Sequence, residues 1–343
     1  MQPKTTLKSL AKILNVSVST VSKSLGNNDE ISEETRQRVR ALANEYNYIP
    51  NQYAVSLRKG TTKTIGVIIP NILNPFFAKV LIGLEEVLSK KGYHVITSIS
   101  HESTSKEVRC IKTMSRGFID GLIMCLAKET QVSKAYSHLD SIVQQKLPIV
   151  LFDRIHNDLQ CDKVINDDYE ASYNTTTHLI RDKGCKNIAL VSSICGIHLG
   201  NLRMEGYKQA LQDHGIEVNE KYIINSPNLT DFTTRIPSLL KDKTIDGYFG
   251  VNESATIRTI NTAKKMNYDV VKELPIAAFC NTSQLRNHPS LIIVNQHAVE
   301  IGHKTAQLML DRLQKDTRKT YTTTTVKASI DYKNQRNTTY KTH

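Results

Sequence analysis

The chain of 343 residues lacks tryptophan, and its six cysteines form no C-x-x-C pair and no zinc-finger spacing. We therefore expect free thiols in a reducing compartment, with no metal site and no cofactor. Long apolar runs are also missing, so no segment is long enough to span a bilayer, and the first residues show no apolar signal region. These absences predict a soluble, cytoplasmic protein without a membrane partner.

The sequence also lacks the short motifs of the common enzyme classes. It contains no G-x-S-x-G nucleophile turn, no G-x-x-x-x-G-K-[ST] phosphate loop, no G-x-G-x-x-G dinucleotide loop and no H-E-x-x-H zinc motif. The 11 histidines are scattered without ligand spacing. We therefore expect a protein that binds its ligands and is not an enzyme.

Acidic residues are scarce at the start of the chain. The whole protein carries a net charge of +12, with 45 Lys or Arg against 33 Asp or Glu. Residues 1–63 hold ten basic and five acidic residues, and the first 28 residues hold no acid at all. A basic, acid-free segment suits a polyanion, and such binding weakens steeply as salt is added. Because the remainder of the chain is also basic, charge alone does not locate the binding site.

Three short helices are predicted in the first 48 residues. The first and the third carry apolar residues at i, i+3, i+4 and i+7, which is the spacing of one helix face. Ser or Thr stands where each N-cap is expected, and Asn15 suits the left-handed turn between the first two helices. A tight turn there is typical of a helix-turn-helix, whose second helix enters the DNA major groove. The caps are Thr6, Ser17 and Ser32, and the apolar faces are Leu7, Leu10, Ala11 and Leu14, then Val39, Leu42, Ala43 and Tyr46.

The second helix, expected at residues 18–25, buries Val21 and Leu25 and turns small, hydroxylated or basic side chains outward. Lys23 can donate to guanine O6 and N7, and Val18 can touch a thymine methyl group. The alternative is an ordinary three-helix domain with a solvated, Ser-rich face. We predict DNA contacts from Ser17, Val18, Ser19, Thr20, Ser22, Lys23 and Asn27.

A connector of residues 49–62 follows the third helix. Pro50 ends that helix, and residues 52–59 contain good helix formers with a narrow apolar face. A helix this short is marginal alone in water, so we expect it to form only against a partner copy or a DNA groove. Leu57 is the candidate wedge between base steps in a minor groove, with Arg58 toward the phosphates. The alternative is a flexible linker.

From residue 63 onward, apolar strand patterns alternate with helical patterns, which predicts βαβ units and parallel sheets. Four strands recur in the same order in two halves of this part, at offsets of 123, 129, 126 and 127 residues. We therefore predict two similar α/β lobes. The strands are expected at 64–70, 93–98, 119–125 and 147–153, and again at 187–193, 222–226, 245–251 and 274–280.

Two such lobes, facing each other, form a cleft. In open parallel sheets, ligands bind beyond the carboxyl ends of the strands. Asp153 and Cys280 occupy equivalent positions in the two halves, so we expect them to face each other across the cleft. The same rule gives the cleft lining as residues 71–77, Ser100, His101, Cys125, Asp153, Arg154, 192–203, Asn252, Glu253, Cys280 and Asn281.

The predicted lining offers binding chemistry. Asp153 can accept two sugar hydroxyls, Arg203 can donate a planar fork to oxygens, and Asn252 can both donate and accept. Phe76 and Phe77 can stack on an apolar sugar face. Each assignment has an alternative, such as a core position for an aromatic ring or a local ion pair for a carboxylate. We predict effector contacts from Asn74, Phe76, Phe77, Asp153, Arg154, Arg203, Asn252 and Cys280.

The last part of the chain returns to a helix, expected at 296–313, and then to Thr-rich strands within 319–327, before residues 330–332 and a polar tail. Such a return indicates that the lobes are joined by more than one crossing. Asp167 and Asp168 follow the first crossing, where they can add acceptors or help to hold the lobes together. We expect a head at 1–48, the connector at 49–62 and a core at 63–343, with lobe one at about 63–163 plus 296–326 and lobe two at about 164–295 plus 327–343.

Several stretches together form a specific pattern: VSVSTVSKSL, then ISEETRQRVRALANEYNYIPNQYAVSLRKGTTKTIGVIIPNILNPFF, and further on FIDGLIM, LPIVLFDR, NLRMEGYKQAL, VNES and LPIAAF. The pattern covers nearly the whole chain and closely resembles the lac repressor family of bacterial transcription regulators. The resemblance implies a small all-α helix-turn-helix head and an α/β core of two parallel-sheet, Rossmann-like lobes, similar to periplasmic sugar-binding proteins. It also implies base reading by Val18, Ser19 and Lys23, the minor-groove wedge at Leu57, and effector contacts from Arg203 and Asn252.

Two positions depart from the family pattern. Cys280 stands where the family often has an acid, and Arg258 stands where a glycine is usual. We therefore expect the ligand to be held differently from a standard sugar.

Together these features predict a sequence-specific DNA-binding transcription regulator, a repressor. We expect it to bind a palindromic operator as a homodimer and to be gated by a small polar effector, a sugar or a sugar derivative. The first alternative is a cytosolic solute-binding protein without a DNA role. The second is an enzyme built on the same two-lobed core.

Overall fold

The computed structural model describes residues 5–26, 29–48, 60–282, 285, 291–314 and 320–331, and at Val271 and Lys272 the backbone only. The chain divides into two compact units, Met1–Thr62 and Lys63–His343, and each is considered by itself. Within the described ranges, every helix is too short or too polar to cross a membrane.

The first unit contains the three predicted helices at the predicted places. They are α1, Leu7–Leu14, α2, Val18–Leu25, and α3, Glu33–Glu45. Each begins after the predicted Ser or Thr cap, whose side chain accepts a hydrogen bond from a backbone N–H of the first turn. Asn15 ends α1 in the left-handed conformation, with φ of 52° and ψ of 44°, and so makes the tight turn into α2.

The apolar faces of the three helices form one small core. Leu10, Val21 and Val39 are almost completely buried, one from each helix. Two details differ from the sequence prediction. Tyr46 lies beyond the end of α3 and is 44% exposed, because the helix stops before its last predicted apolar position, and Tyr48 packs on the core in its place. Ser24 is also buried, with its hydroxyl donating to the Thr20 carbonyl of the preceding turn at 2.8 Å.

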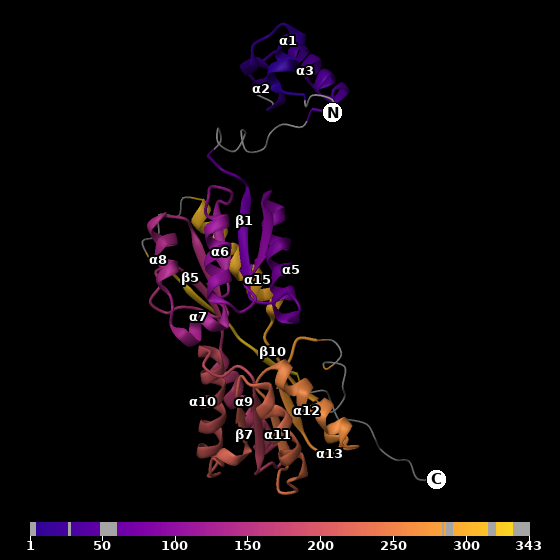
Figure 1. Ribbon diagram of the computed structural model, residues 1–343, viewed down its shortest axis with the longest axis vertical. Coiled ribbons are helices and arrows are strands. Elements are labelled where there is room, and N and C mark those ends of the chain that lie inside the picture. The colour runs from indigo at the N-terminus through magenta and orange to yellow at the C-terminus, as the bar shows by residue number, and fades with distance from the viewer. Residues whose placement is uncertain are drawn as a thin grey trace, which may run out of the picture. The chain divides into compact units, whose positions relative to one another are not determined.

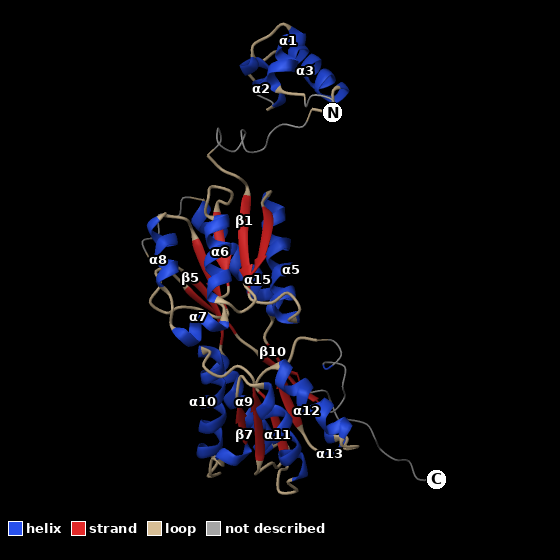
Figure 2. Ribbon diagram, viewed as in Figure 1, coloured by secondary structure: helices blue, strands red, loops and turns tan. Residues whose placement is uncertain are grey.

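The second unit holds two six-stranded sheets, one in each lobe (Figures 1 and 2). The strand orders are β11-β5-β4-β3-β1-β2 and β12-β10-β9-β8-β6-β7, and every pairing is parallel except β10 with β12. The first sheet contains β1 Thr64–Ile69, β2 His94–Ile99, β3 Gly121–Met124, β4 Ile149–Phe152, β5 Asp162–Asn166 and β11 Thr323–Val326. The second contains β6 Ile188–Ser192, β7 Ile223–Asn225, β8 Gly247–Gly250, β9 Ile276–Phe279, β10 Leu291–Asn295 and β12 Ser329–Asp331.

Helices pack on both faces of each sheet, so inner strands such as β3, β4, β6, β8 and β9 are buried on both sides, whereas the edge strands β2 and β11 stay partly exposed. The helices of lobe one are α5 Pro75–Leu88, α6 Thr104–Met114, α7 Lys128–Ser133, α8 Ser137–Gln144 and α15 Ala298–Leu313, with the short 3-10 turn η1 Ser89–Lys91. Those of lobe two are α9 Asp168–Arg181, α10 His198–Asp213, α11 Leu229–Lys241, α12 Glu253–Lys265 and α13 Val270–Glu273, with η2 Glu220–Tyr222.

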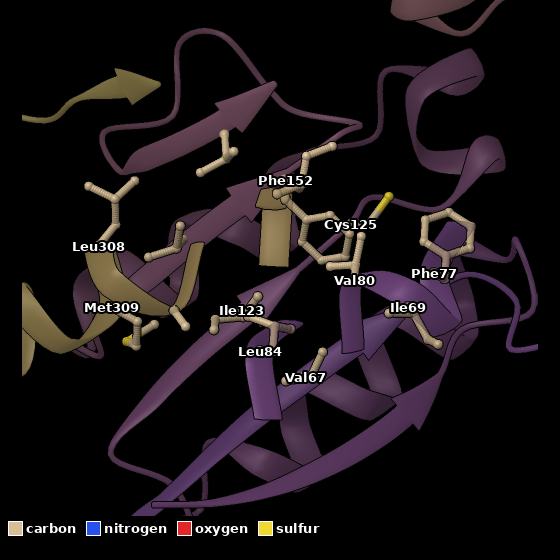
Figure 3. Close-up of a cluster of buried hydrophobic side chains, with 14 of the residues drawn as sticks. Val67, Ile69, Phe77, Val80, Leu84, Ile123, Cys125, Phe152, Leu308 and Met309 are labelled. Carbon is tan, nitrogen blue, oxygen red and sulfur yellow. The ribbon is translucent and has the colours of Figure 1, made fainter. Parts of the chain in front are cut away.

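The core of lobe one joins segments that lie far apart in the sequence. Figure 3 shows strand residues such as Ile69 and Phe152 packed against α5 and against Met309 of α15. The helices α5 and α15 approach each other closely because glycines meet at the contact. A Cβ added at Gly83 would lie 2.1 Å from the Val299 carbonyl oxygen, a distance that no packed side chain tolerates.

The eight strands expected from the internal repeat are all present, and so is the helix expected near the end of the chain. Within the Thr-rich stretch expected as strand lies β11, and β12 follows outside it. The repeat pattern missed two strands, β5 and β10. This affects the lobe boundary: we expected the first crossing at about residue 164, but β5 runs through that position in the lobe-one sheet, so the crossing comes after Asn166.

Three crossings join the lobes, and all three are short. Asp167 alone separates β5 from α9, two residues separate β10 from α15, and two more separate β11 from β12. Asn166, at the end of β5, joins the crossings through its buried side chain. Its Nδ2 donates to the Gln296 carbonyl at 3.1 Å and to the Val326 carbonyl at 2.9 Å, and its Oδ1 accepts from Gln296 Nε2 at 3.3 Å. Asp167 Oδ1 accepts from the backbone N–H of Ala328 at 2.7 Å, which ties the first crossing to the third.

We predict that Asn166→Ala lowers the free energy of unfolding by about 2–4 kcal/mol, because it leaves buried groups on two other crossings without partners. Urea denaturation followed by circular dichroism measures this loss. Asn225→Ala is the matched control, since Asn225 is exposed at the end of β7, and we expect a change within about 0.5 kcal/mol there. Equal effects in the two variants would show that the amide does not hold the crossings together.

Candidate functional site

The outward face of α2 is the first candidate site. Ser17, Val18 and Ser19 are exposed, and Val18 has 41% of its surface open to solvent. The Ser17 hydroxyl is engaged locally, because it accepts from the Thr20 N–H at 3.0 Å and lies 2.7 Å from the Ser19 hydroxyl. The helix therefore presents a row of small polar groups at its N-terminal end, where a recognition helix meets base edges.

The basic group of this face has a partner inside the head. Lys23 Nζ forms an ion pair with the Glu30 carboxylate, and both side chains reach solvent, with 41% and 65% of their surface exposed. An exposed pair of this kind contributes little to stability, so Lys23 can exchange Glu30 for a nucleic-acid acceptor at small cost. Thr20, Ser22 and Lys23 are half-buried on the flank of α2. The other predicted DNA contacts, Asn27, Leu57 and Arg58, lie outside the described residues.

The second candidate site is a pocket of about 540 Å3 between the two lobes of residues 63–331. It lies beyond the carboxyl ends of the strands, as the strand rule predicts. Residues of both lobes and of one crossing contribute to it. The described residues that line it are Asn71, Leu73, Asn74, Pro75, Phe76, Phe77, Asp153, Arg154, Ile194, Leu199, Arg203, Asn252, Glu253, Ser254, Ile257, Arg258, Asn261, Phe279, Asn281, Thr282 and Gln296.

The structure brings seven of the eight predicted effector residues together in this pocket: Asn74, Phe76, Phe77, Asp153, Arg154, Arg203 and Asn252. Cys280 is the exception, and its prediction was wrong. Its side chain is completely buried in the core of lobe two, and its Sγ lies 3.5 Å from Glu253 Oε1. The equivalence with Asp153 fails because Asp153 takes a left-handed backbone, with φ of 59°, whereas Cys280 does not.

The broader lining prediction was also wrong at the ends of two lobe-one strands. Ser100 and His101 do not belong to the pocket lining. Cys125 is completely buried, and Figure 3 shows it within the core of lobe one. Its Sγ lies 3.8 Å from Asp153 Oδ2, so it lies behind the pocket wall and contacts the carboxylate from there.

Arg203 is part of a buried network. Its Nε and Nη2 both donate to Asp168 Oδ1, at 2.8 and 2.7 Å, and its Nη1 donates to the Val251 carbonyl at 2.8 Å. Its guanidinium lies 3.6 Å from the centre of the Phe279 ring. Asp168 thus holds the arginine in place. Arg203 lines the pocket with its charge already compensated.

Asp153 is the acceptor of the lobe-one wall. Only 8% of its side chain is exposed, and burial raises the pKa of its carboxyl to about 6, which the nearby charge of Arg154 offsets only in part. Arg154 donates through Nη1 to Glu102 Oε2 at 2.5 Å, while its Nε lies 3.9 Å from Asp153 Oδ2. Asp153 therefore has only this longer ion pair with Arg154, and its oxygens can accept hydrogen bonds from a ligand.

The aromatic pair and the two asparagines also have structural roles. Phe76 and Phe77 are 4% and 1% exposed, with ring centres 5.3 Å apart and an angle of 77° between planes, so only ring edges reach the pocket. Asn74 caps α5 by accepting from the Phe76 N–H at 3.0 Å. Asn252 Oδ1 accepts from the Ser193 N–H at 3.0 Å, which fixes the loop after β6.

Two lysines bridge the lobes on the sides of the pocket. Lys79 Nζ, on α5, donates to the Asn281 carbonyl at 2.6 Å, and Lys128 Nζ, on α7, donates to the Ser193 carbonyl at 3.1 Å. These two hydrogen bonds connect the lobes directly. A ligand that changes the closure of the lobes must change these two contacts as well.

Sequence reasoning missed most of the pocket wall on α12, where it identified only Glu253 and the unusual Arg258. Ser254, Ile257, Arg258 and Asn261 lie at i, i+3, i+4 and i+7, the spacing of one helix face, and this spacing could have identified them. It also missed Gln296, a buried residue of the second crossing that lines the pocket. Among the residues that the structure describes, no group of three or more His, Cys, Asp or Glu side chains is placed to hold a metal ion.

Two family models match the chain, and together they span most of it. Residues 6–51 match the model of bacterial regulatory proteins, lacI family, and residues 62–335 match the model of periplasmic binding proteins and the sugar binding domain of the LacI family. The boundary between the two matches falls in the segment that joins the two compact units.

Similar proteins cover more than nine-tenths of the chain. Catabolite control protein A of Priestia megaterium is 29% identical over 317 residues, which covers 91% of this chain and 93% of that protein. The sucrose operon repressor of Pediococcus pentosaceus is 29% identical over 323 residues and covers 92% and 93%. The solved lac repressor dimer, bound to operator and the anti-inducer ONPF, has the same fold, with a TM-score of 0.80 at 17% identity over 96% of this chain and 98% of that one. The chain therefore belongs to the LacI family and is a DNA-binding regulator of transcription.

Proposed function

We propose that the protein represses transcription by binding a near-palindromic operator as a homodimer, and that a sugar-like effector in the inter-lobe pocket changes this binding. The observation that supports the proposal most is the exposed polar face of α2 in a head whose first residues are basic and free of acid. Similar proteins include repressors named for the sucrose and ribose operons. We place the protein in the cytoplasm, where the bacterial chromosome lies.

The head reads DNA through α2. Its N-terminal residues approach base edges, where Ser19 and Ser22 donate or accept hydrogen bonds and Val18 contacts a thymine methyl group. Lys23 leaves Glu30 and donates to guanine. The head thereby loses one exposed ion pair, which contributes little to its stability, and gains a hydrogen bond that distinguishes guanine from other bases. Leu57 and Arg58 are proposed to act in the minor groove between the two half-sites.

The pocket holds the effector by hydrogen bonds and ring contacts. Asp153 accepts hydroxyls, Asn252 uses its amide, and the edges of Phe76 and Phe77 meet the apolar side of a sugar ring. Arg203 supplies the two N–H groups that Asp168 and the Val251 carbonyl leave unused. These groups bind and orient the ligand, and we propose that it leaves the pocket chemically unchanged.

Effector occupancy reaches the heads through the crossings. Gln296 lines the pocket, accepts from Asn281 Nδ2 at 3.2 Å and donates to Asn166 Oδ1 at 3.3 Å, so one chain of side chains joins the ligand wall to all three crossings. A ligand shifts the closure of the lobes only by as much as it prefers one closure over the other. In a dimer, a change in closure changes the spacing of the two connectors and hence the fit of both heads to two half-sites.

Selection of duplex DNA from a random pool tests the operator. We expect a near-palindromic sequence, a complex of two chains per duplex and an affinity that falls steeply with salt. Lys23→Gln should weaken binding to the selected duplex by about 1–3 kcal/mol and weaken binding to scrambled DNA much less, because it removes a base contact. Fluorescence anisotropy with both duplexes measures the two affinities.

Lys12→Gln is the matched control for this variant, since Lys12 is exposed on α1 and does not belong to the outward face of α2. It should weaken both duplexes alike. If Lys23→Gln behaves in the same way, α2 does not read bases. If the wild-type protein prefers no sequence at all, the alternative of a solute-binding protein without a DNA role gains support.

Effector binding should depend on pH through Asp153. The carboxylate form accepts two hydroxyls, and with a pKa of about 6 it is mostly protonated at pH 5, so we expect affinity to fall about tenfold between pH 7.5 and pH 5. Isothermal titration with the best sugar from a thermal-shift screen measures this change.

Asp153→Asn provides the control for the pH profile and should remove this component of it. The same variant tests the sign of the folding linkage. The folded carboxyl keeps its proton up to about pH 6, against an ordinary value of 3.8, so wild-type stability should fall relative to the variant as pH rises between these values. A wild-type affinity that is constant from pH 7.5 to 5 would remove Asp153 from the effector site.

A further inference from the structure

The pocket has two chemically different walls. The wall of lobe one presents the acceptor Asp153 and the rings of Phe76 and Phe77. The wall of lobe two on α12 presents Ser254, Arg258 and Asn261, at i, i+4 and i+7 of one helix face. All three of these polar side chains can donate hydrogen bonds, and all three are exposed.

The three donors of the α12 wall have no partners in the part of the chain that the structure describes. The side chains of Ser254, Arg258 and Asn261 make no hydrogen bond or ion pair with any described residue, and the nearest ring contact of Arg258 is Phe232, at 5.9 Å from its Cζ. Residues 283–290, which are mostly undescribed, contain no acidic residue in the sequence. The donor capacity of this wall is therefore available to a ligand.

Charge compensation separates Arg258 from the other two arginines of the pocket. Arg154 pairs with Glu102, and Arg203 pairs with the buried Asp168. Arg258 has no such carboxylate. It contributes a positive charge that the described protein leaves uncompensated at the pocket wall.

The start of α12 adds a second source of positive potential. The helix has 13 residues, and no side chain caps its N-terminus, because Asn252 Oδ1 accepts from Ser193 instead. The one carboxylate nearby, Glu253, already accepts from the backbone N–H groups of Asn281 and Thr282, at 3.2 and 3.0 Å. These bonds hold its oxygens toward the loop after β9.

We infer that the α12 wall is an anion subsite and that the effector is a phosphorylated sugar, an inference that rests on the proposed function of the pocket. The phosphate ester lies against Ser254, Arg258 and Asn261, and the hydroxylated ring lies toward Asp153. A phosphate fits this wall better than a carboxylate does, because a guanidinium, a hydroxyl and an amide together match its three terminal oxygens.

Paired titrations test the assignment. The probes are glucose, fructose and ribose, each with its terminal phosphate ester, and inorganic phosphate alone. In the pair that binds, we expect the ester to bind at least about tenfold more tightly than the free sugar, and Arg258→Gln to abolish that difference by weakening the ester far more than the free sugar. Inorganic phosphate should raise the thermal midpoint of the wild type above that in chloride of equal ionic strength, and Arg258→Gln should make this rise smaller.

Arg116→Gln is the matched control, because Arg116 is an exposed arginine of lobe one outside the pocket lining. It should keep both the ester preference and the phosphate stabilisation. Phosphate binding to the basic head is unchanged in both variants, so the difference between them reports on the pocket.

The outcomes separate the subsite from the proposed function. Equal affinity for sugar and ester, an ester preference that survives Arg258→Gln, or tighter binding of glucuronate than of glucose 6-phosphate would overturn the phosphate assignment. If neither a sugar nor its ester binds, and inorganic phosphate shifts the thermal midpoints of the wild type and Arg258→Gln equally, the phosphate assignment is also overturned. If phosphate stabilises the wild type through Arg258 but no sugar or ester binds, the subsite stands and the sugar-gated function fails.

Discussion

The buried amide of Asn166 is the point on which the two-lobed core depends. Three separate crossings pass between the lobes. The Asn166 amide bonds to Gln296 on the second crossing through both Nδ2 and Oδ1, and to Val326 at the start of the third through Nδ2. Buried amides are costly to leave unpaired, so the three crossings are held to one arrangement. Because each crossing is only one or two residues long, a change in lobe angle must be absorbed within these few residues.

The pocket inherits its geometry from this junction. Gln296 belongs both to the second crossing and to the pocket lining, and it holds Asn281 on the wall of lobe two. Lys79 reaches the carbonyl of the same Asn281 from lobe one. A ligand against this wall therefore contacts groups whose positions change directly with the closure of the lobes. No long chain of intermediate residues is needed to couple the ligand to that closure.

The sequence predicted those elements best whose determining residues lie close together in the chain. The head was predicted almost residue by residue because its caps and its left-handed Asn15 act within one helical turn. The strands of the repeat were found because their apolar runs are continuous. Strand β5 was missed because it buries Asp162, a charge that pairs with Arg312 of α15, 150 residues later, so no local pattern shows that this strand is buried.

The site was predicted from the carboxyl ends of the strands. That rule gives the position of a residue in the chain near the pocket, but not the direction in which its side chain points. Asp153 and Cys280 follow equivalent strands, yet a left-handed residue turns one toward the pocket and the other is buried against Glu253. Arg203 illustrates a second limit, since an arginine at the predicted place carries a compensating Asp168 that spacing does not reveal. The charge that a pocket offers to a ligand is set by which of its ionised groups lack partners. In this pocket the partnered arginines shape the wall, and the α12 face, which the strand rule does not reach, determines its charge.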